Sequence, residues 1–157
     1  MRIGLAANQA HHSHAESALF HWLRASRQGI RELGIRLHAV GRTYDAIVRD
    51  GVLGDYDGLV RYPYGRDGGL MKLVAEIVGL PESGRALDGA VYFIHPVDPS
   101  SIFPEAIALK RQCVIHQKPF ISTVASARDW VEQDDRACPF RRWRKAGFEI
   151  IDCRRVD

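Results

Sequence analysis

The sequence has no apolar run of the roughly 18 residues that a membrane-spanning helix requires, so we expect no membrane segment. It is also poor in cysteine, with only Cys113, Cys138 and Cys153 and no CxxC pair. An odd number of widely spaced cysteines is typical neither of a disulfide framework nor of a cysteine metal site. The opening MRIGLAANQAHH becomes polar too early for a secretory signal, so the sequence predicts a cytoplasmic protein.

The charge balance has no strong excess of either sign. The net charge of +3 permits an acidic ligand, but it does not by itself indicate nucleic acid. Three histidines lie close together, His11, His12 and His14, but no cysteine or acidic set accompanies them. We therefore expect no metal and no cofactor, and we interpret this segment as a flexible rim or an anion contact.

Short apolar runs alternate along the chain with segments of helical periodicity. Strands are predicted at 2–7, 35–40, 57–62, 89–94 and 119–123. Helices are predicted at 16–34, 43–50, 69–80, 104–117 and 126–133. This alternation is typical of an α/β fold, in which helices cover both faces of a mainly parallel sheet. The expected architecture is a three-layer α/β/α domain with a five-stranded sheet.

The composition changes after residue 133. We expect one α/β domain over 1–133 and a charged extension over 134–157 that packs on the core. The RRWRK run of the extension, Arg141 to Lys145, suits an acidic partner, a solvated face or a subunit contact. It has one aromatic residue, Trp143, but no recognised nucleic-acid-binding fold accompanies it.

Parallel sheets bind ligands at the carboxyl ends of their strands, so a site is expected in the turns that follow the predicted strands. In one of them Gly41, Arg42 and Thr43 begin a helix. The first turn of a helix presents N–H groups to an anion, and a guanidinium adds a planar donor fork. The alternative reading is a turn glycine, a surface arginine and a helix cap.

The turn RYPYGRDGG repeats this arrangement after the third predicted strand. Gly65 contributes to a tight turn, while Arg61 and Arg66 are suited to an anion. Asp67 has two readings: a cap for the following helix, or a general base beside the ligand. Further along, His95 directly follows the central strand, where it is either an acid–base group or structural.

Taken in order, these motifs resemble the methylglyoxal synthase family. The chain matches the family patterns IALIAHD, YATGTTG, SGPxGGDQQ, DxLIFFWDPL and KALLRLATVYNIPVATNxATAD with IGLAANQ, LHAVGRTYD, RYPYGRDGG, DGAVYFIHPV and IALKRQCVIHQKPFISTVASARD. The similarity extends from about Met1 to Asp129. It implies a Rossmann-like or flavodoxin-like fold, a homo-oligomer that is commonly a hexamer, and elimination of phosphate from dihydroxyacetone phosphate.

The resemblance assigns roles residue by residue. Asp67 falls on the family's catalytic aspartate, and Gly41 and Thr43 fall on its phosphate turn. Arg42 replaces the other threonine of that turn, and Arg61 replaces a serine. These two changes add positive charge where the family binds phosphate.

Other positions depart from the family in its acid–base groups. Asn8 and Gln9 stand where the family has a His-Asp pair, and His95 stands where it has the aspartate of WDP. The histidine of its PHDxD segment becomes Ile102, and the second aspartate becomes Glu105. The site gains anion affinity and loses titratable groups.

Two functions are open at this stage. The first is a lyase of methylglyoxal synthase type that acts on dihydroxyacetone phosphate or a related small phosphorylated substrate. The second is a non-catalytic domain that binds a phosphorylated metabolite. The predicted catalytic residues are Asp67 and His95. The predicted ligand-binding residues are Asn8, Gly41, Arg42, Thr43, Arg61, Gly65 and Arg66.

Overall fold

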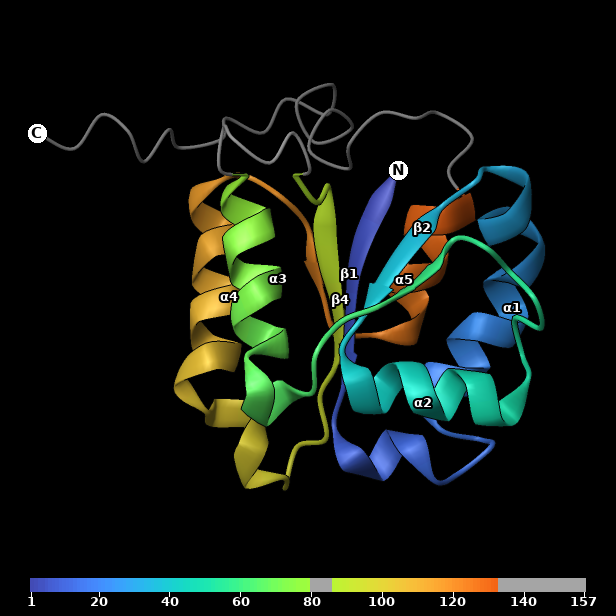
Figure 1. The fold of residues 1–157 in the computed structure, drawn as a ribbon, viewed down its shortest axis with the longest axis horizontal. Coiled ribbons are helices and arrows are strands. Elements are labelled where there is room, and N and C mark those ends of the chain that lie inside the picture. The colour runs from blue at the N-terminus through green and yellow to red at the C-terminus, as the bar shows by residue number, and fades with distance from the viewer. Residues whose placement is uncertain (80–85, 133–157) are drawn as a thin grey trace, which may run out of the picture.

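The computed structural model describes residues 1–79 and 86–132, whose five strands form one parallel sheet (Figure 1). The strands are β1 (Arg2–Ala7), β2 (Arg36–Ala39), β3 (Leu59–Arg61), β4 (Gly89–Phe93) and β5 (Phe120–Ile121). The α-helices are α1 (Ala18–Glu32), α2 (Gly41–Asp50), α3 (Gly69–Val78), α4 (Pro104–Ile115) and α5 (Val124–Glu132). The 3-10 turns are η1 (Gln9–His12), η2 (Gly65–Asp67) and η3 (Pro99–Ile102).

The strand order is β3-β2-β1-β4-β5, so the chain changes direction across the sheet between β1 and β4. Ile3 of β1 pairs with Leu37 of β2 on one side and with Gly89 of β4 on the other. Every residue of β4 is buried, as the unbroken apolar run predicts for a strand covered on both faces. The three-layer fold expected from the sequence is confirmed.

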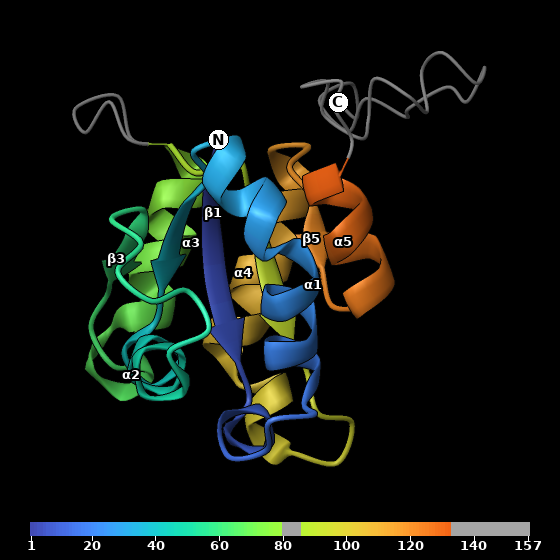
Figure 2. The same ribbon diagram turned by 90° about the vertical axis from the view of Figure 1, so that its right-hand side faces the viewer.

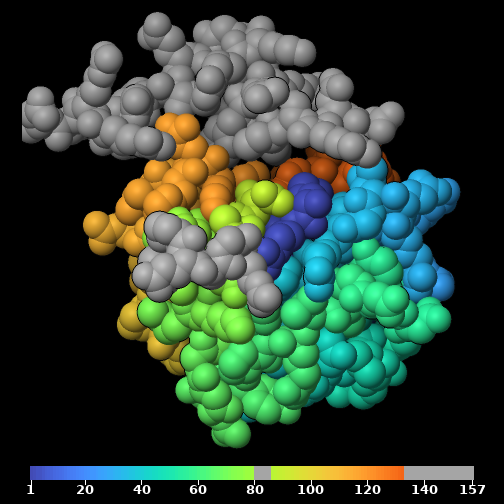
Figure 3. All heavy atoms as spheres, turned by 45° about the horizontal axis from the view of Figure 1, so that its top comes forward, coloured from blue at the N-terminus to red at the C-terminus, as the bar shows by residue number. Residues whose placement is uncertain are grey.

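Helices cover both faces of this sheet. In Figure 1, α3 and α4 lie on one face and α1 on the other, while α2 lies across the end where the strands finish. Figure 2 shows α1 and α5 side by side on their common face. Each face has its own core, one around Trp22 and Phe93 and the other around Leu73 and Leu109. Figure 3 shows the opposite end of the molecule, where the amino end of β1 reaches the surface near the centre.

The structure rules out two helix caps that were among the alternatives drawn from the sequence. Thr43 does not cap α2, because this helix begins two residues earlier, at Gly41, and buries Thr43 in its first turn. Asp67 does not cap α3, because Gly68 takes that position in the left-handed conformation, with φ of 88°. Cys113 is buried, and burial raises the pKa of its thiol to about 12.

The predicted extension, 134–157, lies outside the described residues, as do the last residues of two predicted helices, at 80 and 133. No helix in the described part of the chain has the length and apolarity needed to cross a membrane.

A buried histidine on β2 makes the stability of the fold depend on pH. His38 is 4% exposed and accepts a hydrogen bond at Nε2 from Arg2 Nε, at 3.3 Å. Burial, followed by the charge of Arg2, lowers the pKa of His38 from 6.5 to about 4. The unfolded chain therefore binds a proton that the folded chain does not bind, in the window between these two values. The contribution of neutral His38 to the free energy of unfolding is complete above pH 6.5 and is lost as the pH falls towards 4.

We predict that His38→Phe, which does not titrate, weakens this dependence. The loss of unfolding free energy between about pH 7.5 and pH 5 should shrink by about 2 kcal/mol relative to the unsubstituted protein. Urea denaturation at the two pH values measures it. The control is His14→Gln, which replaces an exposed loop histidine outside the core. A His38→Phe protein with the full pH dependence would contradict the prediction.

Candidate functional site

A cavity of about 510 Å³ opens at the carboxyl ends of β1 and β4, next to the start of α2. Its walls come from the loops after β1, β2, β3 and β4, which gather at the same end of the sheet in Figure 1. The lining residues are Ala6, Ala7, Asn8, Gln9, His12, Val40, Arg42, Thr43, Tyr64, Gly65, Arg66, Leu70, Tyr92, Asp98, Ser100, Phe103 and Glu105. Because the strand order changes direction between β1 and β4, the cavity lies where open parallel sheets bind their ligands.

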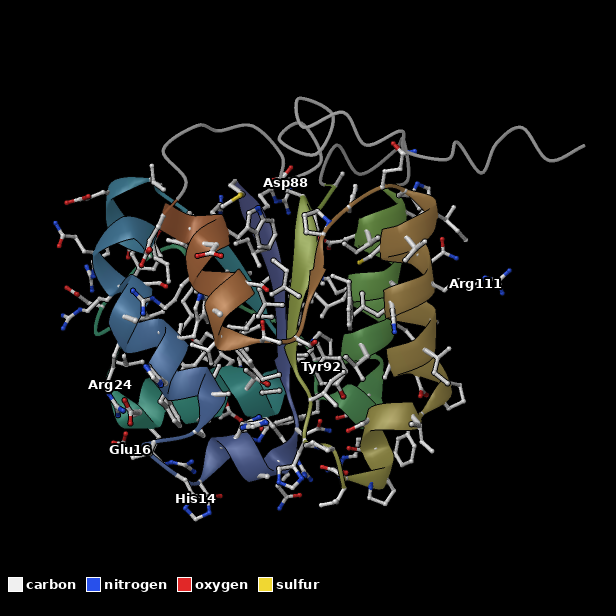
Figure 4. The ribbon with its side chains drawn as sticks, turned by 180° about the vertical axis from the view of Figure 1, so that it is seen from behind. His14, Glu16, Arg24, Asp88, Tyr92 and Arg111 are labelled. Carbon is white, nitrogen blue, oxygen red and sulfur yellow. The ribbon has the colours of Figure 1, made fainter. Side chains whose placement is uncertain are left out.

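The inner end of the cavity is formed by residues near the carboxyl ends of β1 and β4. Ala6 and Tyr92 lie opposite each other in the register of these two strands, and both are buried. Figure 4 shows Tyr92 at the carboxyl end of β4, while Asp88 marks its other end. Burial, followed by the charge of Asp98, raises the pKa of Tyr92, so its hydroxyl stays protonated and can donate.

One wall of the cavity is basic. Arg42 and Arg66 line it, and the first turn of α2 has no side-chain cap. The Gly41 N–H donates to Pro63 O at 3.0 Å, so the N–H groups of the next two residues belong to the open end of the helix. These elements share one preference, because helix N–H groups and guanidinium groups both bind anions.

The glycine at the start of α2 allows the turn after β3 to approach this closely. A Cβ at Gly41 would lie 2.6 Å from Tyr64 Cδ1 and 3.0 Å from Tyr64 N. Any larger residue would separate α2 from the turn that carries Arg66. The sequence motifs around Gly41 and around RYPYGRDGG are therefore two halves of one wall.

A neutral histidine, His12, lines the cavity beside the basic wall. Thr43 Oγ1 accepts from the Ala7 N–H at 3.1 Å and lies 3.2 Å from His12 Nε2. Burial, followed by the charges of His11, Arg42 and Arg49, lowers the pKa of His12 to about 4. The positive charge of this wall at neutral pH therefore comes from the guanidinium groups and the helix end rather than from an imidazolium.

The opposite wall is acidic and connected by hydrogen bonds. Asn8 Nδ2 donates to Ser100 Oγ at 2.8 Å, and Ser100 Oγ donates to Asp98 Oδ1 at 2.7 Å. The bonds from Ser100 hold the pKa of Asp98 below its usual value. Glu105, in the first turn of α4, adds a second carboxylate to this wall. Positive and negative groups thus face the same cavity from different sides.

Asn8 joins the acidic wall to the sheet. Its side-chain oxygen accepts from the His95 N–H at 2.8 Å and from Ser101 Oγ at 2.9 Å, while its amide nitrogen donates to Ser100. The residue is only 3% exposed, so these bonds take up most of its hydrogen-bonding capacity. Asn8 therefore holds the loop after β4 against the end of β1.

The structure brings together five of the residues predicted to bind a ligand. The cavity is lined by Asn8, Arg42, Thr43, Gly65 and Arg66. Two others do not line it. Gly41 contributes only close packing, and Arg61 forms an ion pair with Asp45 at 3.2 Å.

Neither predicted catalytic residue lines the cavity. Asp67 is 55% exposed and lies 3.7 Å from Arg66 Nε, within the turn that carries the basic wall. The His95 ring lies 6.0 Å from the ring of His11, and the His95 backbone serves to hold Asn8. Their catalytic roles stay predictions.

Several lining residues were not singled out from the sequence as site residues. They are Tyr64, Tyr92, Asp98, Ser100 and Glu105, whereas His12 belongs to the segment interpreted from the sequence as a rim or an anion contact. Glu105 carried the clearest signal, because it falls where the resembling family has an aspartate. Within the described residues, no three histidine, cysteine or acidic side chains are grouped so that they could hold a metal ion.

No protein-family model matches the chain, and no curated protein sequence matches it either. Among solved structures, the fold is similar to that of a methylglyoxal synthase from Elizabethkingia anophelis, with a TM-score of 0.61. The match covers 85% of this chain and 78% of that chain, at 23% sequence identity. This similarity supports a methylglyoxal synthase-like fold, in agreement with the resemblance noted from the motifs.

Proposed function

We propose that the protein binds a small phosphorylated metabolite in the cavity at the end of β1 and β4. The observation that carries this proposal is the convergence of Arg42, Arg66 and the uncapped first turn of α2 on one wall. A phosphate against this wall would accept hydrogen bonds from N–H donors and lie beside the positive charges of Arg42 and Arg66. The cavity, at about 510 Å³, has the size of small-molecule sites.

We further propose elimination of phosphate from dihydroxyacetone phosphate as the reaction to test first. The fold is similar to that of a methylglyoxal synthase, and Glu105 and Asp98 supply carboxylates across the cavity from the basic wall. In this reaction a carboxylate takes a proton from the hydroxyl-bearing carbon next to the carbonyl, which gives an enediolate. The carbon–oxygen bond to phosphate then breaks, and phosphate leaves with the bonding electrons. The enol that remains takes up a proton on its terminal carbon to give methylglyoxal. Cationic donors at the phosphate stabilise the charge that develops on it.

Binding without turnover is the second candidate, and the end of β1 favours it. Asn8 and Gln9 do not titrate, and the Asn8 side chain is engaged in hydrogen bonds to the loop after β4. His12 is neutral at physiological pH, because its pKa is about 4. A domain of this kind would report the level of a phosphorylated metabolite rather than convert it.

We predict that Arg42→Gln weakens the binding of inorganic phosphate and of dihydroxyacetone phosphate by about 10-fold or more. The reason is that hydrogen bonds from a charged group contribute about 1.5–3 kcal/mol each, and 1.4 kcal/mol corresponds to a factor of ten. Isothermal titration calorimetry measures the affinity, and an assay of methylglyoxal release on the same samples separates turnover from binding.

The matched control is Arg111→Gln, which removes the same charge from the outer surface of α4. Figure 4 shows Arg111 directed away from the molecule, so this variant should bind phosphate with unchanged affinity. Absence of saturable binding to the unsubstituted protein would overturn the proposal. Equal affinities of Arg42→Gln and the unsubstituted protein would overturn the assignment of the phosphate to this wall.

A further inference from the structure

A second cavity, of about 550 Å³, adjoins the first along α2. The residues that line both cavities are Gln9, His12, Arg42, Tyr64 and Arg66. The second cavity adds Arg49 and Asp45 from the next turns of α2. Because these residues form a wall common to both spaces, a ligand that fills the first cavity can extend into the second.

The second cavity presents guanidinium groups whose charge no acid in the described part of the chain neutralises. Arg42 and Arg49 are seven residues apart, which places them on the same side of α2. Arg42 Nη1 donates to Gln9 Oε1 at 3.4 Å, and Arg49 Nη2 donates to the carbonyl of His12 at 2.5 Å. Both acceptors are uncharged, and neither arginine has an ion-pair partner in residues 1–79 and 86–132. Each guanidinium has five N–H donors, so most of them are available to a ligand.

Asp45, the acidic residue that lines the second cavity, already forms an ion pair with Arg61. Asp45 accepts from the guanidinium of Arg61 at 3.2 Å and from the Tyr64 hydroxyl at 2.9 Å. The Arg61 guanidinium also lies over the Tyr64 ring, 5.0 Å from its centroid. Arg61, which the sequence suggested as a phosphate ligand, therefore neutralises Asp45, and among the described residues no acid compensates the charge of Arg42 and Arg49.

The two cavities differ in their acidic groups. Asp98 and Glu105 line the first cavity and do not line the second. A second phosphate placed beside these carboxylates would be repelled, whereas one placed beside Arg49 would be attracted. A ligand with two phosphates therefore has one favourable orientation, with its second phosphate directed along α2.

From these contacts we infer that the second cavity is an anion-binding subsite and that the preferred ligand is a small bisphosphorylated metabolite. This inference rests on the proposed function, which places the first phosphate at the start of α2. Seven residues of helix separate the backbones of Arg42 and Arg49 by about 10 Å along the axis. A sugar with a phosphate at each end can bridge this separation.

The test compares fructose 6-phosphate with fructose 1,6-bisphosphate, because these two probes differ only in the second phosphate. Titration calorimetry at constant ionic strength should give at least about 10-fold tighter binding for the bisphosphate. Arg49→Gln should reduce this advantage to within about twofold and leave the monophosphate affinity within about threefold. Arg49→Lys, which keeps the charge but loses the planar fork, should retain part of the advantage.

Arg111→Gln is again the control and should keep the full advantage of the bisphosphate. Equal affinities for the two probes, or an advantage that survives Arg49→Gln, would overturn the inference while leaving the proposed function in place. If neither probe, nor inorganic phosphate, binds at all, both the inference and the proposed function fail. Circular dichroism of each variant confirms that a lost affinity does not come from unfolding.

Discussion

Replacing Gly69 by alanine should destabilise the protein by at least about 3 kcal/mol, because the added methyl group collides with backbone rather than with a flexible side chain. A Cβ at this position would lie 2.1 Å from Pro63 O and 2.9 Å from Tyr64 O. The turn has little room to move away. Pro63 O accepts from the Gly41 N–H at 3.0 Å, and Tyr64 O accepts from the Gly69 N–H at 2.9 Å.

The same substitution should also abolish phosphate binding, since the strained turn connects α3 to the start of α2. Chemical denaturation gives the change in stability, and calorimetry with inorganic phosphate gives the change in affinity. The matched control is Gly65→Ala, four residues earlier in the same turn. A Cβ there would meet no atom within 4 Å, so the stability should change by no more than about 0.5 kcal/mol. Similar stabilities for the two variants would show that close packing of this turn is not required.

Glu105→Gln should lower the turnover of dihydroxyacetone phosphate by about 100-fold or more, the usual effect of removing a positioned general base. Glu105 is the carboxylate at the start of α4 that faces the cavity, across from Arg42 and Arg66. The variant keeps the size of the side chain but can no longer accept a proton. Its affinity for inorganic phosphate should remain equal or rise slightly, because a negative charge is removed from the cavity.

Asp67→Asn belongs in the same experiment, because the sequence resemblance gives the role of base to Asp67. Initial rates of methylglyoxal formation, with phosphate affinities measured in parallel, distinguish the two carboxylates. Loss of turnover in Glu105→Gln alone supports a base in the cavity wall. Loss of turnover in Asp67→Asn alone would contradict the prediction for Glu105 and would require the turn η2 to bring Asp67 to the ligand.

The order of strands and helices followed from the sequence because hydrophobic periodicity reports burial directly. The run at β4 is apolar throughout, and the structure buries all of it. Elements built from polar residues or from glycine were harder to predict from the sequence. The η1 turn, Gln9–His12, has no apolar face and was expected to be a loop. The start of α2 was placed two residues late, because a glycine there reads as a turn unless the close approach of Tyr64 is known.

The loops that form the site could be predicted from the sequence, but the side chains that face into the cavity could not. Strand order brings the loops together, so Arg42 and Arg66 were found from their turns alone. Asp67, which follows Arg66 in the chain, does not line the cavity. No sequence pattern shows which of these two neighbouring side chains faces the cavity. Ser100 was missed for a related reason: its place in the wall depends on hydrogen bonds to Asn8 and Asp98.

The bonds around Asn8 have a consequence for any attempt to restore the histidine that the resembling family has at this position. The Asn8 side chain accepts from the His95 N–H and from the Ser101 hydroxyl while it donates to Ser100. An imidazole has only two nitrogen atoms, and the neutral ring has only one acceptor, so it cannot replace all three bonds. A single exchange at residue 8 would leave buried polar groups of the β4 loop unpaired. A histidine at residue 8 would therefore require further substitutions in the β4 loop to pair the groups that Asn8 now satisfies.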